Sequence, residues 1–244
     1  GRKFNFPGLN PLTYRGLPGA FADTLPDDFG NAVINAWLSR EGRSLESFTP
    51  LERLLYQGRR GMGALEYEPA TKGISMKVSE KRKLDSLTNM AQEVLDQRAG
   101  YVERIADEKE MALLNLMKVG TSAGGARPKA VIGLNADKTE LRSGQVALPD
   151  GFDYYLIKFD GVTESLQSNE VFGDHKGYGR MEYAYYLMAM DCGINMSECG
   201  LLEDESRAHF ITKRFDRLRE EQKHVQTLND MAHADYKKPG FYSY

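Results

Sequence analysis

Residues 154–159 read YYLIKF, an apolar and aromatic run with a single charged side chain, Lys158. A short run of this composition predicts a β-strand. Residues 179–191 are expected to form a helix, because apolar side chains recur there at helical spacing: Met181, Ala184, Tyr185 and Met188. Glu182 lies early in that helix. This strand and this helix give the framework on which the flanking chain is interpreted.

Lys158 and Glu182 each allow two interpretations. Lys158 could lie on the solvent face of a half-buried strand, or it could point into a cleft and meet phosphate. Glu182 could be a solvated residue in a first helical turn. A lysine on a strand followed by a glutamate on the next helix is, however, the ion-pair arrangement that orients a kinase lysine toward nucleotide phosphates.

Upstream, residues 129–134 (KAVIGL) predict another strand, and GTSAGGARPK at 120–129 precedes it. Small residues let backbone amides approach a polyanion, and a following lysine adds charge. The segment has neither the Walker A nor the GxGxxG spacing, so an ordinary turn remains the alternative.

Downstream, residues 201–202 and 209–214 are expected to be strands on either side of a hairpin loop at 203–206. Residues 211–217 (ITKRFDR) could be a strand that leaves the core, or a linker between two lobes. The order of elements, from glycine-rich loop to linker, matches the N-lobe of a protein kinase. The predicted fold class is therefore α+β, an antiparallel sheet plus helices.

A small N-terminal α+β subdomain, residues 1–75, is expected to precede this kinase-like region, residues 76–244. Residues 1–26 predict irregular structure anchored by Phe21 and Leu25. The remaining predicted elements are a helix from Asp27 to Gly42, a capped helix from Thr49 to Gly61, a strand at 61–69, a linker at 70–79, and helices at 80–99, 108–117 and 221–232.

The composition argues against a nucleic-acid-binding protein, a disulfide or metal site, and a membrane protein. The formal net charge of −3 provides no global basic field for nucleic acid. The two cysteines, Cys192 and Cys199, lack paired spacing, and the four histidines share no metal-ligand spacing. No apolar run is long enough to span a bilayer and the start has no signal-peptide core, so a cytoplasmic location without membrane contact is expected.

The segments GTSAGGARPKA, YLIKFD, MEYAYYLMAMDCGI and ITKRFDR together resemble HipA-family serine/threonine protein kinases, the toxins of bacterial toxin–antitoxin modules. LPGAFADTLPDDFG and GALEYEP resemble that family's N-terminal subdomain. The resemblance implies ATP binding by a loop over the phosphates, by Lys158 oriented by Glu182, and by a hinge beside adenine. The implied loop residues are Gly124, Gly125, Ala126, Arg127, Pro128 and Lys129, and the implied hinge residues are Lys213, Arg214 and Phe215. Ser122 falls where the family carries an autophosphorylated serine, whose charge would repel nucleotide.

Two departures from the family pattern bear on activity. The family's hinge usually opens with an acidic residue, whereas Lys213 is basic. The catalytic Asp and the Mg²⁺ ligands, which the family carries in a DGHxKN-like segment and a later Tyr-Asp segment, are absent. The chain is therefore expected to contain no catalytic residue and no metal ligand and to be inactive alone, as a fragment of a longer kinase or as a split or decayed member.

Two functions compete. In the first, a kinase with ATP and Mg²⁺ phosphorylates a protein substrate, and this chain supplies its ATP-binding portion. In the second, the chain is a non-catalytic binding module for an antitoxin or another protein. The resemblance implies a HipB-like antitoxin as partner, with DNA reached only indirectly through it.

Overall fold

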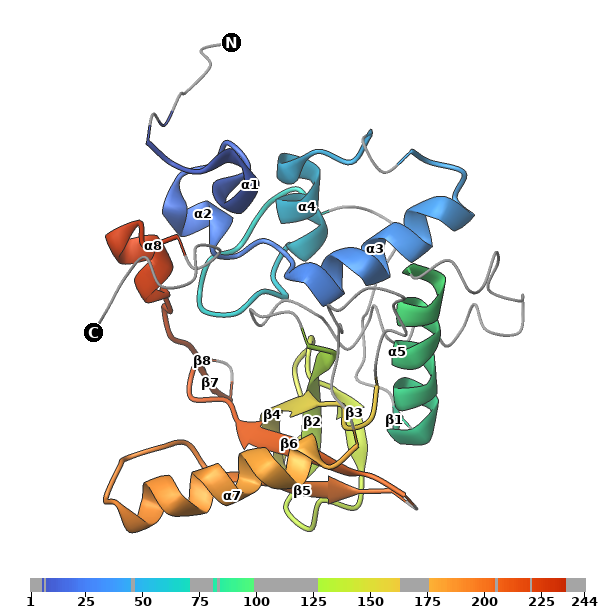
Figure 1. Ribbon diagram of the computed structural model, residues 1–244, viewed down its shortest axis with the longest axis vertical. Helices are drawn as coiled ribbons and strands as arrows, with labels where there is room; N and C mark the ends of the chain where they lie inside the picture. Colours follow the sequence, from blue (N-terminus) through green and yellow to red (C-terminus); the bar gives the residue numbers. More distant parts are fainter. Residues whose placement is uncertain are drawn as a thin grey trace.

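The structure is a computed structural model that describes residues 6, 8–44, 47–70, 81–82, 84–98, 127–162, 176–204, 206–219 and 221–235. Four helices precede the sheet and lie together in the upper part of Figure 1: α1 (Pro11–Tyr14), α2 (Gly19–Ala22), α3 (Asp28–Arg40) and α4 (Pro50–Gln57). The single turns α1 and α2 replace the irregular structure expected for residues 1–26. Within that region Leu25 is buried as predicted, whereas Phe21 is exposed and meets the edge of the Tyr67 ring.

The predicted starts of the two longer N-terminal helices are confirmed. Asp27 is the N-cap of α3, and its carboxylate accepts a hydrogen bond from the Gly30 amide at 2.6 Å. Thr49 and Glu52 form a capping box at the start of α4, with each side chain bonded to the other residue's amide. Helix α4 ends at Gln57, before the expected Gly61.

A six-stranded antiparallel sheet forms the centre of the molecule and confirms the predicted fold class. Its order is β1-β3-β2-β4-β6-β5. The strands are β1 (Lys81–Arg82), β2 (Lys129–Asn135), β3 (Leu141–Ser143), β4 (Phe152–Lys158), β5 (Cys199–Glu203) and β6 (Ala208–Lys213). Strands β2 and β4 and the hairpin of β5 and β6 were predicted, whereas β1 and β3 were not.

Two helices of the sheet region differ in how they are buried. Helix α5 (Leu84–Arg98) packs against α3, lying below it and steeply inclined to it in Figure 1, and its buried side chains join α3 and one face of the sheet in a single apolar core. The helix predicted at 80–99 is thus confirmed. Helix α7 (Tyr178–Asp191) packs against β5 and β6, as the two views agree, yet Met181, Tyr185 and Met188 of its apolar side are exposed.

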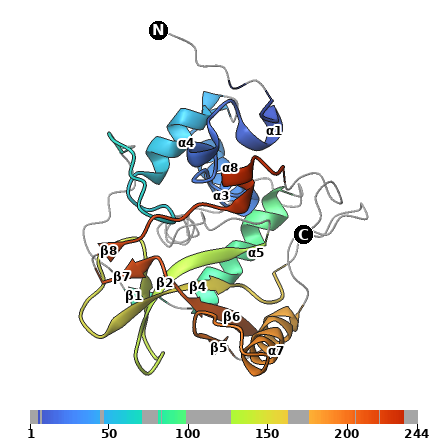
Figure 2. The same cartoon turned by 90° about the vertical axis from the view of Figure 1, so that its left-hand side faces the viewer.

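The last described segment returns to the N-terminal helices (Figure 2). After the hairpin of β7 (Arg217–Leu218) and β8 (Glu221–Gln222), the chain forms α8 (Leu228–Ala232) against α2. Asp235 accepts hydrogen bonds from Asn10 at 2.6 Å and from Thr13 at 2.7 Å. The prediction of a helix over 221–232 is therefore wrong for its first half, because Arg217–Leu218 and Glu221–Gln222 pair as strands and the helix begins only after the Thr227 cap.

The strand predicted at residues 61–69 is also wrong. The backbone there bonds to side chains from beyond the sheet instead of a neighbouring strand: the Gly63 amide donates to Asp216 at 2.9 Å, and the Gly61 carbonyl accepts from Arg217 at 2.8 Å. Gly63 also has a φ of 75°, outside the extended region. The predicted helix at 108–117 and nearly all of the predicted linker at 70–79 lie outside the described residues.

Candidate functional site

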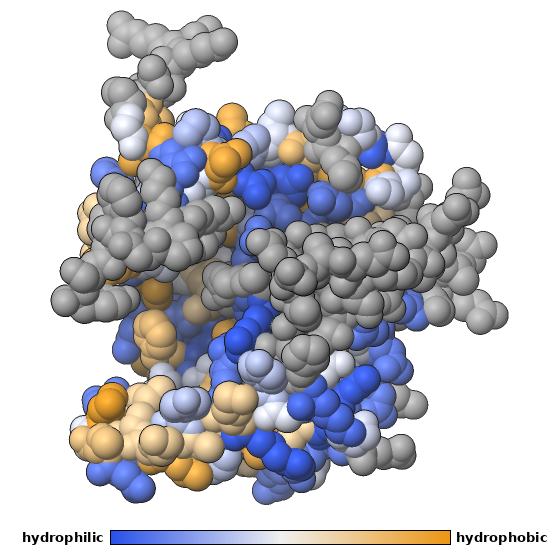
Figure 3. Space-filling view, in the orientation of Figure 1, coloured by the Kyte–Doolittle hydropathy of each residue, from blue (hydrophilic) through white to orange (hydrophobic). Residues whose placement is uncertain are grey.

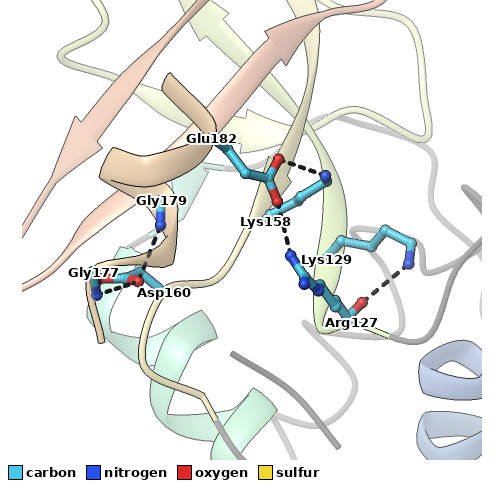
Figure 4. Close-up of polar contacts among 7 residues, drawn as sticks. All are labelled: Arg127, Lys129, Lys158, Asp160, Gly177, Gly179 and Glu182. Carbon is cyan, nitrogen blue, oxygen red and sulfur yellow. Dashed lines mark hydrogen bonds and ion pairs between the residues drawn. The ribbon is translucent and has the colours of Figure 1, made fainter. Parts of the chain in front are cut away.

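Lys158 is the last residue of β4, and its ammonium meets the carboxylate of Glu182 on α7. The Nζ–Oε2 distance is 2.6 Å, and both side chains are only partly exposed, at 32% and 21% (Figure 4). Phe210 is the cross-strand neighbour of Lys158 on β6, and the ammonium lies 5.6 Å from the centre of its ring. The structure thus brings together the two residues that the sequence placed in kinase order, with an aromatic face beneath the cation.

Helix α7 owes its position to a carboxylate that sequence reasoning missed. Asp160 is buried, and its side chain accepts hydrogen bonds from the amides of Gly177 at 2.8 Å and Gly179 at 3.2 Å. These amides lie at the start of α7, where a negative charge is stabilising (Figure 4). A Cβ at Gly179 would clash with the Ala208 carbonyl, so the helix lies directly against β6. Asp160, two residues after Lys158, therefore holds the start of the helix that carries Glu182.

His209 supports Asp160 from the hairpin of β5 and β6. Its Nδ1 accepts a hydrogen bond from the Asp160 amide at 2.9 Å, so Nε2 carries the hydrogen and donates to Asp204 at 3.0 Å. Burial lowers the pKa of His209, and the nearby Asp204 carboxylate only partly offsets that effect. The neutral ring is the form that can accept the Asp160 amide.

Arg127 is a second cation on the same carboxylate. Its guanidinium lies 3.2 Å from Oε1 of Glu182 and 5.2 Å from the centre of the Tyr178 ring. One glutamate therefore holds both Lys158 and Arg127, one on each oxygen (Figure 4). Two positive groups gathered at a partly exposed position suit an anion with several oxygens, such as a polyphosphate.

Lys129 lies differently from its neighbour Arg127. Its side chain is 3% exposed, and Nζ forms an ion pair with Asp27 at 2.6 Å and donates to the Arg127 carbonyl at 3.0 Å. Burial raises the pKa of Asp27, although Lys129 and the Gly30 amide act in the opposite direction. This geometry favours a structural role for Lys129 over a direct contact with phosphate.

The three predicted hinge residues have different surroundings. Lys213 pairs with Asp153 at 2.6 Å on the outside of the sheet. Arg214 is buried and forms two hydrogen bonds with Asp216, at 2.9 and 2.5 Å. Phe215 is exposed, at 59%. The amide of Arg214 donates to the Tyr154 carbonyl, so the backbone here continues the pairing of β6 with β4.

Asp216 ties this segment to Gly63, in the irregular segment that follows α4. Burial alone would raise the pKa of Asp216, but its bonds to Arg214 and to the Gly63 amide outweigh burial and hold the pKa below its ordinary value. Sequence reasoning missed Asp216 and Asp160. The only signal for Asp216 was the neighbouring Arg214, and no local pattern joins Asp160 to Gly177 and Gly179.

Of the predicted loop, Gly124, Gly125 and Ala126 lie outside the described residues, as does Ser122. The Pro128 carbonyl accepts the amide of Phe159 at 3.0 Å, so the exit of the loop lies beside the end of β4. Among the residues that the structure describes, no three His, Cys, Asp or Glu side chains gather as metal ligands. In the same ranges, no helix has the length and apolar character needed to cross a bilayer.

Two family models match the chain. A HipA-like C-terminal domain matches residues 121–244, and a HipA N-terminal domain matches residues 6–68. The first covers more than half of the 244 residues. No curated protein matches the chain. The two matches contain the residues described above: Lys158 and Glu182 lie in the C-terminal match, and Asp27 lies in the N-terminal match.

Proposed function

Because the chain belongs to the HipA family of toxin–antitoxin proteins, we propose that it is the ATP-binding portion of a serine/threonine protein kinase that phosphorylates a protein substrate. The ion pair between Lys158 and Glu182 carries this proposal. A lysine held by a helix glutamate presents a fixed positive charge to the nucleotide phosphates in protein kinases. Arg127 adds a second cation at the same carboxylate.

The face of the sheet that bears Lys158 suits a purine beside those phosphates. Val131, Leu156 and Thr212 are paired across β2, β4 and β6. Leu156 and Thr212 each lie two residues along their strands from Lys158 and Phe210. Side chains paired in this way share a face of the sheet. ATP would place its base against this row of two apolar side chains and one threonine, near the backbone of Lys213 and Arg214, and its phosphates toward Lys158. Mg²⁺ would be bound by residues beyond those described.

The test of this proposal is MgATP binding to the chain by isothermal titration, with phosphoryl transfer measured in a longer protein that contains it. Lys158→Ala is expected to remove detectable binding and transfer. Lys223→Ala, which removes an exposed lysine away from α7, is the matched control and is expected to behave as wild type. Equal binding by wild type and Lys158→Ala would exclude Lys158 from the function.

A second candidate is a non-catalytic module that binds an antitoxin, and the exposed apolar surface of α7 favours it. Met181, Tyr185 and Met188 are exposed along this helix, and Figure 3 shows apolar residues gathered over the region of α7 at its lower left. Large exposed apolar surfaces often mark protein interfaces. A Tyr185→Ser/Met188→Ser variant that loses antitoxin binding, in a chain that binds no MgATP, would favour this candidate over the kinase.

A further inference from the structure

Asp27, at the start of α3, links the N-terminal helices to Lys129 of the candidate site. Its two oxygens have different partners: Oδ1 accepts the Gly30 amide at the start of α3, and Oδ2 pairs with Lys129 at the start of β2. Both charged side chains are almost fully buried, at 4% and 3% exposed. A buried ion pair of this kind fixes the two elements that it joins, because separating two buried opposite charges is costly.

From Lys129 the contacts continue without a break to Lys158. The Lys129 ammonium donates to the Arg127 carbonyl at 3.0 Å, the Arg127 guanidinium lies 3.2 Å from Glu182, and Glu182 lies 2.6 Å from Lys158 (Figure 4). Lys129 thus holds the backbone of Arg127 through its carbonyl, while the side chain of Arg127 reaches the carboxylate of Glu182. Any displacement of this backbone would move the guanidinium relative to Glu182.

We propose that Asp27 is a positioning residue for the nucleotide site: through Lys129 it holds the backbone of Arg127, and so sets how Arg127 and Lys158 share Glu182. This role rests on the proposed ATP-binding function. The N-terminal subdomain then contributes to the geometry of the nucleotide site, because Asp27, which caps α3, also holds Lys129. A partner that tilts α3 would then change nucleotide affinity without touching the nucleotide.

The test compares two variants. Asp27→Asn keeps an acceptor for the Gly30 amide but removes the charge partner of Lys129. We expect it to melt at a lower temperature, because a buried ammonium loses the carboxylate charge opposite it, and to bind MgATP about tenfold more weakly, the scale of one lost hydrogen bond to a charged group. Asp27→Asn/Lys129→Met removes both buried charges, so thermal stability should recover. MgATP affinity should not, because the Arg127 carbonyl has lost its donor.

Joint recovery of stability and affinity in the double variant would overturn the proposal, since a purely structural ion pair predicts that result. Asp235→Asn is the control for charge loss in the N-terminal region, because it weakens the bonds to Asn10 and Thr13 without contacting the site. Its MgATP affinity should equal that of wild type. An equal loss of affinity in this control would also overturn the proposal.

A readout without nucleotide separates this proposal from the proposed function. Hydrogen–deuterium exchange of the peptide at 127–131 should be faster in both Asp27 variants than in wild type, and unchanged in Asp235→Asn. If the wild-type chain binds no MgATP, the proposed function fails, while exchange still decides whether Asp27 holds this backbone. Wild-type exchange in the double variant would show that it does not.

Discussion

Glu182 holds two cations with one carboxylate, and this sharing sets what its loss would do. Glu182→Gln keeps the size of the side chain but leaves Lys158 and Arg127 with no fixed charge between them. We expect MgATP affinity to fall about tenfold, because each cation loses the strong hydrogen bond that orients it. Isothermal titration measures this change.

Glu203→Gln is the matched control for Glu182→Gln. Glu203 pairs with Arg180 at 2.7 Å, but both side chains are largely exposed. Such pairs contribute about 0–1 kcal/mol to stability. MgATP affinity should therefore be unchanged in Glu203→Gln, and a loss as large as that of Glu182→Gln would mean that the charge of this region matters more than the particular ion pair.

The lowered pKa of His209 predicts that the fold is less stable in acid. Its pKa is lowered in the fold from the ordinary 6.5, so the unfolded chain binds the proton more readily. The free energy of unfolding should therefore decrease as the pH falls through and below about 6.5. Protonation also removes the acceptor for the Asp160 amide. Denaturant unfolding at a series of pH values measures the decrease, and His209→Gln should flatten the profile in that window.

At the scale of elements, the attachment of α7 depends on the absence of a side chain at Gly179. Gly179→Ala should destabilise the fold by about 1–3 kcal/mol, the usual cost of overpacking, because the new Cβ would clash with the Ala208 carbonyl. Alanine favours helix more than glycine does, so propensity alone predicts the opposite sign. Thermal unfolding distinguishes the two, and Ala184→Gly on the exposed side of α7 reports propensity alone.

Elements stabilised by their own side chains could be predicted from the sequence. Helices α3, α4, α5 and α7 carry caps or periodic apolar residues, and β2, β4 and β6 carry apolar runs. The failure at residues 217–227 came from a local hairpin, in which Arg217–Leu218 pairs with Glu221–Gln222. The failure at residues 61–69 occurred where backbone groups bond to residues far along the chain. Residues 61–69 bond to Asp216 and Arg217, which no local pattern could indicate.

The candidate site divides in the same way. The pair of Lys158 and Glu182 was predicted from the order of elements from the glycine-rich loop to the linker, together with the family resemblance. Lys129 looked like part of a phosphate-binding loop because its partner, Asp27, is remote in sequence. Asp160 was missed because its bonds to Gly177 and Gly179 depend on how β4 and α7 are joined in space.

At the scale of the whole molecule, Asp216 joins the end of the sheet to Gly63, in the segment that follows α4. Asp216→Ala would leave Arg214 buried without its carboxylate and the Gly63 amide without its acceptor. The free energy of unfolding should fall by about 3–5 kcal/mol, as for other broken buried pairs. Denaturant unfolding measures this. A double variant with Arg214→Met should recover part of the loss, and no recovery would mean that the bond to Gly63 dominates.

The contact of α8 with α1 and α2 also has a consequence for the order of folding. Asn10 and Thr13 meet Asp235, and Tyr14 donates to the Asn229 carbonyl, so these first helices have partners more than two hundred residues away. Contacts of such long range close late, because the entropy of a large loop is lost before they form. On the ribosome, α1 and α2 would leave the exit tunnel long before α8, and they would complete their packing only after α8 had emerged.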